Sequence, residues 1–291
     1  MEMKIGIIGG AGKMGRWFAG LLLKEGCSVM ISDVNKEALS AAREELNVES
    51  LSSPRMTKAA DIILLAVSID SFEDALKEIA PYARPGQVIA DITSLKDQPM
   101  ALMHRYLDKA TVLGTHPLFG PGAKDLANQN FVLTPTNEQE NVLARKTMNY
   151  LQKHGAKVTV LTPQKHDEMM SVVLGLAHFI SIVAADTLGD IGQLQKLKDI
   201  GGSTYRVLTT LVESVISEDP ELYASLQMRL PLVQEMEQLF QMHAAKWAEL
   251  VQKQDRPAFV KNMNALKYKF AKDNANFGQA YDNMYKIMEW L

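Results

Sequence analysis

The chain has 291 residues, of which 47% are hydrophobic and 22% are charged, which is enough for one large or two ordinary domains with a substantial core. The formal net charge is -3 and both signs are spread along the chain, which argues against a surface for nucleic acid or for a membrane. The single cysteine, Cys27, permits neither an internal disulfide nor a cysteine-based metal cluster and suits a reducing compartment. Because Lys4 leads directly into an apolar strand and not into a signal peptide, we expect a cytoplasmic protein.

The first candidate site lies where a short β-branched run, residues 5–8, passes into Gly10-x-Gly12-x-x-Gly15 and then into an amphipathic segment. Strand, glycine-rich turn and helix follow one another in the order of a dinucleotide-binding site. We expect Gly10 to make the turn, Gly12 to let the backbone approach a pyrophosphate, and Gly15 to let helix and strand pack closely. The helix then directs its free N–H groups at the phosphates.

The second strand, residues 28–33, ends in a carboxylate. Asp33 lies in the window, roughly 20 residues after the glycines, where an acidic side chain accepts the ribose hydroxyls of NAD and repels the 2′-phosphate of NADP. We therefore expect NAD as the cofactor. Lys36 is close enough in sequence to weaken the preference for NAD over NADP. The residues that we assign to cofactor binding are Gly10, Gly12, Lys13, Met14, Gly15 and Asp33.

Short apolar strands alternate with helical segments up to about residue 161, which predicts a doubly wound, parallel, Rossmann-type α/β sheet. From residue 163 onward, apolar residues recur at helical spacing and strand patterning disappears. We therefore predict a dinucleotide-binding domain at 1–162 and an all-helical domain at 163–291. Further strands are expected near residues 61–67, 87–91, 111–115, 131–134 and 157–161.

The apolar stretch at residues 169–185 is at the lower limit of length for a membrane span and contains polar residues. We predict that it is a buried helix at the centre of the helical domain, with a second subunit as one candidate for covering it. We interpret the preceding His166, Asp167 and Glu168 as a solvated helix start and not as a metal site, because consecutive helical residues point in different directions. No metal is therefore expected.

Two loops with polar side chains follow neighbouring strands of the predicted sheet. Residues 92–96, Ile-Thr-Ser-Leu-Lys, follow one strand, and residues 116–121, His-Pro-Leu-Phe-Gly-Pro, follow the next. Ligands of such sheets bind outside the carboxyl ends of the strands. Prolines on both sides restrict the backbone of the second loop and so the position of the His116 imidazole. From this position alone, a functional and a structural histidine are equally good interpretations.

The pattern Asp91-x-x-Ser94-x-Lys96, followed by His116-Pro-Leu-Phe-Gly-Pro121 and preceded by the glycine motif, resembles the prephenate dehydrogenase family. Residues 172–179, which include His178, and Ser203-Thr-Tyr-Arg206 agree in order and spacing, so the resemblance covers essentially the whole chain. It implies oxidative decarboxylation of prephenate to 4-hydroxyphenylpyruvate and carbon dioxide, with hydride transfer to NAD, in tyrosine biosynthesis. It also implies a homodimer formed through a helical domain that contributes to the substrate site.

The resemblance implies roles for four residues. His116 is the candidate base for the substrate hydroxyl, since a neutral imidazole with an unperturbed pKa of about 6.5 can accept a proton near neutral pH. Ser94 positions His116, the substrate hydroxyl or the nicotinamide. Arg206 holds a substrate carboxylate in a bidentate pair, and His178 lies near the substrate or the nicotinamide. Without the resemblance, Arg206 would be a surface residue, His178 a core histidine and Lys96 an exposed lysine.

Three alternatives remain open at this point. Arogenate carries an amino group where prephenate has a keto oxygen, and no residue here selects between them, so the chain could equally be an arogenate dehydrogenase. A β-hydroxyacid-type NAD(P)-dependent dehydrogenase also joins a nucleotide domain to helices, but the expected Lys-x-x-x-Asn pair is missing from residues 165–186. A non-enzymatic NAD-binding sensor would not need His116, Ser94 and Arg206 together.

Overall fold

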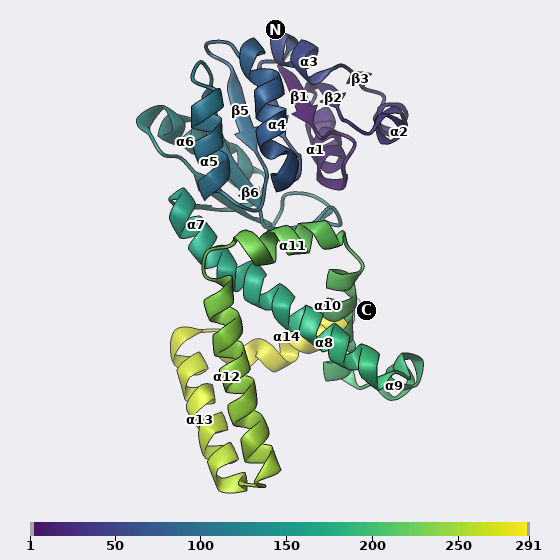
Figure 1. Cartoon of the computed structure of the whole chain (residues 1–291), viewed down its shortest axis with the longest axis vertical. Coiled ribbons are helices and arrows are strands. Elements are labelled where there is room, and N and C mark those ends of the chain that lie inside the picture. The colour runs from purple at the N-terminus through teal and green to yellow at the C-terminus, as the bar shows by residue number, and fades with distance from the viewer. Residues whose placement is uncertain (1–2, 290–291) are drawn as a thin grey trace. The chain divides into compact units, whose positions relative to one another are not determined.

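The computed structural model of this chain describes residues 3–289 (Figure 1). The chain forms two compact units, Met1–Met169 and Met170–Leu291. The first is built on a sheet, and the described part of the second contains helices without strands. The predicted fold class, a doubly wound α/β sheet with a second helical domain, is confirmed. The domain boundary predicted at residue 162 immediately precedes helix α7 (Pro163–Met170), and the two units separate near the end of that helix.

The sheet of the first unit has eight strands. They are β1 (Lys4–Ile8), β2 (Ser28–Ser32), β3 (Glu49–Ser50), β4 (Ile62–Leu65), β5 (Val88–Asp91), β6 (Thr111–Pro117), β7 (Asn130–Thr134) and β8 (Lys157–Val160). Their order across the sheet is β3-β2-β1-β4-β5-β6-β7-β8, and all neighbours are parallel except β6 and β7. Because the chain order reverses between β1 and β4, the carboxyl ends of these strands border the crevice in which such sheets bind ligands.

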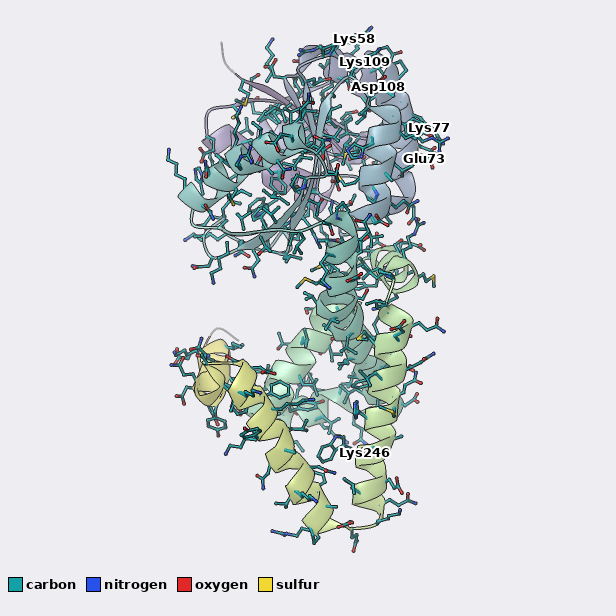
Figure 2. The ribbon with its side chains drawn as sticks, turned by 90° about the vertical axis from the view of Figure 1, so that its left-hand side faces the viewer. Lys58, Glu73, Lys77, Asp108, Lys109 and Lys246 are labelled. Carbon is teal, nitrogen blue, oxygen red and sulfur yellow. The ribbon has the colours of Figure 1, made fainter. Side chains whose placement is uncertain are left out.

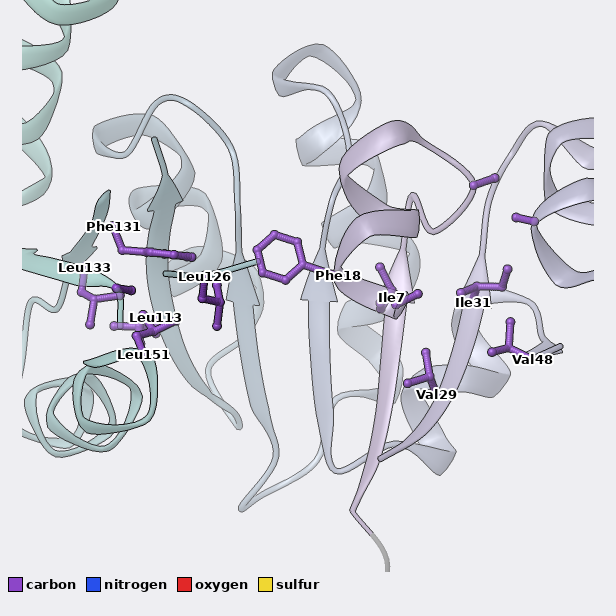
Figure 3. Close-up of a cluster of buried hydrophobic side chains, with 14 of the residues drawn as sticks. Ile7, Phe18, Val29, Ile31, Val48, Leu113, Leu126, Phe131, Leu133 and Leu151 are labelled. Carbon is purple, nitrogen blue, oxygen red and sulfur yellow. The ribbon is translucent and has the colours of Figure 1, made fainter. Parts of the chain in front are cut away.

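Helices pack on both faces of this sheet, because successive side chains of a strand point to opposite faces. Ile7 of β1 belongs to a buried cluster with Phe18 and Leu151 (Figure 3), whereas the next residue, Ile8, belongs to a second buried cluster with Phe72. The first cluster is covered by α1 (Lys13–Lys24), α2 (Lys36–Leu46) and α6 (Glu138–Lys153), and the second by α3 (Ser53–Ala59), α4 (Ile69–Ile79), the turn η1 (Ala80–Tyr82) and α5 (Asp97–Tyr106).

Helix α4 shows how the sequence pattern sets the orientation of a helix on the sheet. Phe72, Leu76 and Ile79 recur at helical spacing and are fully buried. On the outer side of the helix, Glu73 and Lys77 lie one turn apart (Figure 2), with 3.3 Å between Oε1 and Nζ. The apolar stripe therefore faces the core, and the charged pair stays at the surface.

The second unit consists of short and long helices in sequence. They are the π-helical segment η2 (Ser171–Leu176), α8 (Ala177–Ile191), α9 (Leu194–Ile200), α10 (Ser203–Ile216), α11 (Pro220–Arg229), α12 (Val233–Gln252), α13 (Arg256–Asp273), the turn η3 (Phe277–Gln279) and α14 (Ala280–Met288). Helix α8 packs against α10, and η2 packs against α12. The close approach of η2 to α12 requires a glycine at position 175, since a Cβ at Gly175 would lie 2.4 Å from Val233 Cγ2.

The apolar helix predicted at residues 169–185 is present, but within one chain it is not buried as predicted. It belongs to a continuous helix, Pro163–Ile191, in which the most apolar 18-residue window has a mean hydropathy of 1.8 and is 22% buried. Val172 and Val173 remain 47% and 50% exposed. By length and composition this helix could span a membrane, but one such helix is weak evidence, because core helices of soluble proteins pass the same test.

Candidate active site

The glycine-rich loop after β1 has the shape expected of a nucleotide site, although one glycine has another role than predicted. The left-handed residue of the turn is Gly9, with φ at +79°, and not Gly10. Gly10 must be small because a Cβ there would lie 2.7 Å from Ile31 Cβ. Gly15 allows the predicted close packing, since its Cβ would lie 2.2 Å from the Gly9 carbonyl oxygen.

The start of helix α1 leaves room for a ligand. Gly12 is the N-cap residue, it is exposed, and a Cβ at this position would meet only the Gly9 oxygen, at 3.3 Å. As a glycine, this N-cap residue has no side chain that could cap the helix. Free N–H groups at the positive end of a helix bind phosphate, so the loop fits a dinucleotide pyrophosphate. Lys13 and Met14, also assigned to the cofactor, form the first residues of this helix.

The structure brings Asp33 to the glycine-rich loop. It follows the last residue of β2, and its Oδ2 atom accepts the backbone N–H of Ala11 at 3.0 Å. Its Oδ1 atom accepts the backbone N–H of Asn35, also at 3.0 Å. The carboxylate is half-buried, and these two hydrogen bonds hold it at the edge of the crevice with lone pairs left for further donors.

His116 lies near the end of strand β6 and not in the loop predicted to start at this residue, and it is 4% exposed. Its Nδ1 atom lies 2.8 Å from Nε2 of His166, a fully buried residue of α7. The Nδ1 atom of His166 in turn lies 2.7 Å from Oδ1 of Asp167. A carboxylate, an imidazole and the candidate catalytic imidazole therefore form one hydrogen-bonded row.

Asp167 is held in place by the start of helix α5. Its Oδ1 atom accepts the backbone N–H of Lys96 at 2.8 Å, and its Oδ2 atom accepts that of Asp97 at 3.0 Å. Helix α5 has no side-chain cap from its own N-cap residue, so Asp167 supplies acceptors for its first N–H groups. The interpretation of residues 166–168 as a solvated helix start is wrong for His166 and Asp167, which are 0% and 5% exposed.

A buried ion pair lies beside this row. The Nζ atom of Lys96 donates to Oδ2 of Asp91 and, at 3.2 Å, to Oγ1 of Thr93. Both charged side chains are completely buried, so Lys96 is not the exposed lysine that its sequence context suggested. Burial lowers the pKa of Lys96, and the neighbouring Asp91 carboxylate opposes that effect.

The two histidines of the row are neutral near pH 7. Burial lowers the pKa of His116 well below 6.5, and the neighbouring His166 and Lys96 lower it further through electrostatic repulsion. Burial also lowers the pKa of His166, against the opposing effect of its hydrogen bond to Asp167. A neutral imidazole is the form that can accept a proton.

The other predicted residues are distributed over both units. Ser94 is half-buried in the loop before α5, and within residues 3–289 it makes no hydrogen bond to His116. In the second unit, Arg206 is exposed in the first turn of α10. His178 of α8 is half-buried and packs edge to face on Tyr223, with 4.8 Å between ring centres. Among the described residues its Nδ1 atom has no hydrogen-bond partner, and burial lowers its pKa.

The model of the prephenate dehydrogenase nucleotide-binding domain matches residues 18–168. This chain belongs to the prephenate dehydrogenase family. The model of the prephenate dehydrogenase dimerization domain matches residues 162–265, most of the helical unit. The family resemblance found in the sequence is therefore confirmed.

Curated relatives support this assignment. A protein of Methanocaldococcus jannaschii described as "Probable arogenate/prephenate dehydrogenase" is 35% identical over 266 residues, which are 90% of this chain and 60% of the relative. The T-protein of Haemophilus influenzae is 28% identical over 77% of this chain and 56% of its own length. The chain thus spans less than two thirds of the length of these relatives.

Solved structures show the same fold. Prephenate dehydrogenase from A. aeolicus, solved with hydroxyphenyl propionate and NAD+, superposes with a TM-score of 0.77 at 20% identity and covers 94% of this chain and 99% of its own. Synechocystis arogenate dehydrogenase gives a TM-score of 0.68 at 22% identity, covering 94% of this chain and all of its own. At these identities the match establishes the architecture of the family and not the substrate.

Proposed function

We propose that this chain catalyses the NAD-dependent oxidative decarboxylation of prephenate to 4-hydroxyphenylpyruvate and carbon dioxide. The observation that carries the proposal is the buried imidazole of His116, whose pKa is lowered by burial, at the same sheet edge as the glycine-rich loop. Strands β1, β4, β5 and β6 are parallel, so their carboxyl ends share that edge. At about 4.8 Å per strand, the end of β6 lies about 14 Å from the end of β1, a distance that an extended dinucleotide can span.

In this proposal His116 holds the proton that the reaction moves. As the C4 hydroxyl of prephenate becomes a carbonyl, its proton passes to the neutral imidazole. NAD, held by the glycine-rich loop and Asp33, would supply the acceptor for the hydride of ring C4. Loss of the ring carboxylate as carbon dioxide returns the electron pair to the C4 oxygen, which takes the proton back from the imidazolium as the phenol forms. The proton balance closes within the site, so a base with little exposed surface suffices.

The NAD preference rests on Asp33. Its carboxylate is anchored beside the loop by Ala11 and Asn35, where it can accept ribose hydroxyl groups and repel a 2′-phosphate. We include Gly10, Gly12, Lys13, Met14 and Gly15 in the same cofactor site.

The substrate carboxylates require positive charge, and we assign one of them to Arg206. Its exposed guanidinium can form two parallel hydrogen bonds with a carboxylate. His178 is proposed as a neutral polar contact to the substrate side chain or the nicotinamide, since burial lowers its pKa and its Nδ1 atom lacks a partner among residues 3–289. Ser94 is proposed to orient the substrate hydroxyl, the nicotinamide or His116.

The second candidate substrate is arogenate, which the description of the M. jannaschii relative names alongside prephenate. One experiment separates the two candidates: formation of reduced nicotinamide by the purified protein with prephenate or arogenate, each with NAD or NADP. We expect turnover with prephenate and NAD. Turnover only with arogenate would keep the mechanism and change the substrate, turnover only with NADP would overturn the role of Asp33, and no turnover in all four reactions would refute the proposed function.

We also propose that the enzyme is a cytoplasmic homodimer formed through the helical unit. The dimerization-domain match covers that unit, and the apolar side chains of η2 and α8 are half exposed in one chain. A second copy would cover them, which would account for a helix that is apolar on most sides. Light scattering should give twice the 32.3 kDa mass of one chain, and a mass of 32.3 kDa at micromolar concentration would contradict the dimer.

A further inference from the structure

We propose that Asp167 and His166 are positioning residues that fix the tautomer of His116, so that its Nε2 atom carries the free lone pair. This inference rests on the proposed role of His116 as the base. It assigns a task to two buried residues of α7 whose burial the sequence did not reveal.

The direction of the hydrogen bonds follows from the carboxylate at one end of the row. An ionised carboxylate only accepts, so His166 must donate from Nδ1 to Oδ1 of Asp167. A neutral imidazole has one N–H, which leaves Nε2 of His166 as an acceptor. That atom lies 2.8 Å from Nδ1 of His116, which must therefore donate. The remaining nitrogen of His116, Nε2, is left without a proton and can act as the base.

The carboxylate of Asp167 cannot easily rotate. Its two oxygens accept the backbone N–H groups of Lys96 and Asp97, at the positively polarised start of α5. The row thus runs from a helix terminus through α7 to the end of β6. Its geometry is set by three elements of the same unit, α5, α7 and β6.

The charges around His116 favour the neutral form of the row. Lys96 lies close enough to lower the pKa of both histidines, and its partner Asp91 partly offsets this for His166. Asp167 acts in the same direction as Asp91 on His166. When His116 takes a proton at Nε2, its Nδ1–H bond to His166 strengthens, as in other sites where an acidic residue orients a catalytic histidine.

The decisive variant is Asp167→Leu, which is close in size and has no acceptor. Without the carboxylate, His166 can carry its proton on Nε2 and donate it to Nδ1 of His116. His116 then populates both tautomers, and in one of them the proton on Nε2 blocks the base. The imidazolium also loses a stabilising carboxylate. We expect kcat to fall by about 10- to 100-fold, while KM for prephenate changes less than about threefold.

A second variant separates positioning from packing. In His166→Gln the amide oxygen can accept the Nδ1–H of His116 and so preserve its tautomer. We therefore expect His166→Gln to retain more activity than Asp167→Leu, although His166 is the residue in direct contact with His116. The reverse order would indicate that the row only supports packing.

The matched control is Glu140→Gln. Glu140 is another buried carboxylate in contact with a histidine, with 2.6 Å between Oε1 and His104 Nε2, and its Oε2 atom accepts the backbone N–H of Thr136 at 2.7 Å. This pair makes no hydrogen bond to the row within the described residues. We expect kcat of Glu140→Gln to match that of the unaltered protein.

Nitrogen NMR of histidine-labelled protein tests the tautomer without turnover. In the unaltered chain, at a pH above 7, His116 should show a protonated Nδ1 and an unprotonated Nε2, and Asp167→Leu should show both tautomers. An unprotonated Nδ1 in the unaltered chain, or an unchanged single tautomer in the variant, would overturn the inference. Because this measurement needs no substrate, it stands even if prephenate proves not to be the substrate. Normal turnover in Asp167→Leu would refute the positioning role of Asp167 and His166 and leave the proposed function intact.

Discussion

The two units of the chain bury their apolar side chains to different extents. In the sheet unit, residues such as Phe72 and Ile63 have no exposed surface, because helices cover both faces of the sheet within one chain. In the helical unit, Ile200 and Met228 are 82% and 84% exposed, and Phe270 is 58% exposed. An apolar pattern in the sequence therefore indicates that a face needs covering, but it does not indicate whether the same chain provides the cover.

The largest expected difference between the units comes from a matched pair of substitutions. Phe72→Ala should lower the free energy of unfolding by about 3–5 kcal/mol, because it opens a cavity in a closed core. Phe270→Ala removes an aromatic ring that one chain leaves half exposed, so it should cost less than about 1 kcal/mol under conditions in which the protein is monomeric. Urea unfolding at low protein concentration measures both. Equal losses would show that the helical unit buries Phe270 by itself.

Lys96→Met should be nearly as costly as Phe72→Ala. It leaves the Asp91 carboxylate buried without its cationic partner, and breaking a buried ion pair from one side costs about 3–5 kcal/mol. The control is Lys77→Met on the outer face of α4, where the partners of the lysine are exposed. We expect the urea midpoint to fall markedly for the first variant and to stay unchanged for the second. An unchanged midpoint for Lys96→Met would mean that the Lys96–Asp91 pair does not stabilise the fold.

A moderate effect is expected from pH. Burial lowers the pKa of His116 and His166 in the folded chain, whereas the unfolded chain titrates near 6.5, so the unfolded state binds more protons as pH falls below 6.5. The free energy of unfolding should therefore drop with decreasing pH in that window, by up to about 1.4 kcal/mol per pH unit for each histidine. Denaturant unfolding at several pH values measures the slope. The double variant His116→Asn/His166→Gln should flatten it, and an undiminished slope would contradict the buried neutral pair.

The smallest effect on folding is expected for Val173→Asn. Val173 is 50% exposed in one chain, so the free energy of unfolding of the monomer should change by less than about 0.5 kcal/mol. If a second copy covers this face, the same substitution should weaken self-association, which sedimentation at a series of concentrations would detect. A stable monomer with unaltered self-association would place the dimer interface elsewhere.

Local patterns were sufficient to predict the fold and the glycine-rich loop. The strand at residues 5–8, the glycines and Asp33 follow one another closely in the sequence, and their geometry is set by nearby residues. Even there, the left-handed turn residue was assigned to Gly10 instead of Gly9, because two adjacent glycines are alike in sequence.

The polar row could not be predicted because it joins residues that are distant in sequence. His166 and Asp167 lie 50 or more positions after His116, and their burial depends on how α7 packs against the ends of β6 and α5. The only available signal was a His-Asp pair close after the last strand of the sheet. Lys96 was misjudged for another reason: its partner Asp91 is only five positions away, but the burial of both side chains depends on how the sheet unit encloses them.

The role of His116 as the base is tested most directly by comparing His116→Asn with Arg206→Gln in turnover and in prephenate binding. His116→Asn should lower kcat by about 10²- to 10⁴-fold and leave the dissociation constant of prephenate nearly unchanged, because a base acts on the transition state. Arg206→Gln should mainly weaken prephenate binding. Full turnover by His116→Asn would contradict the proposed mechanism.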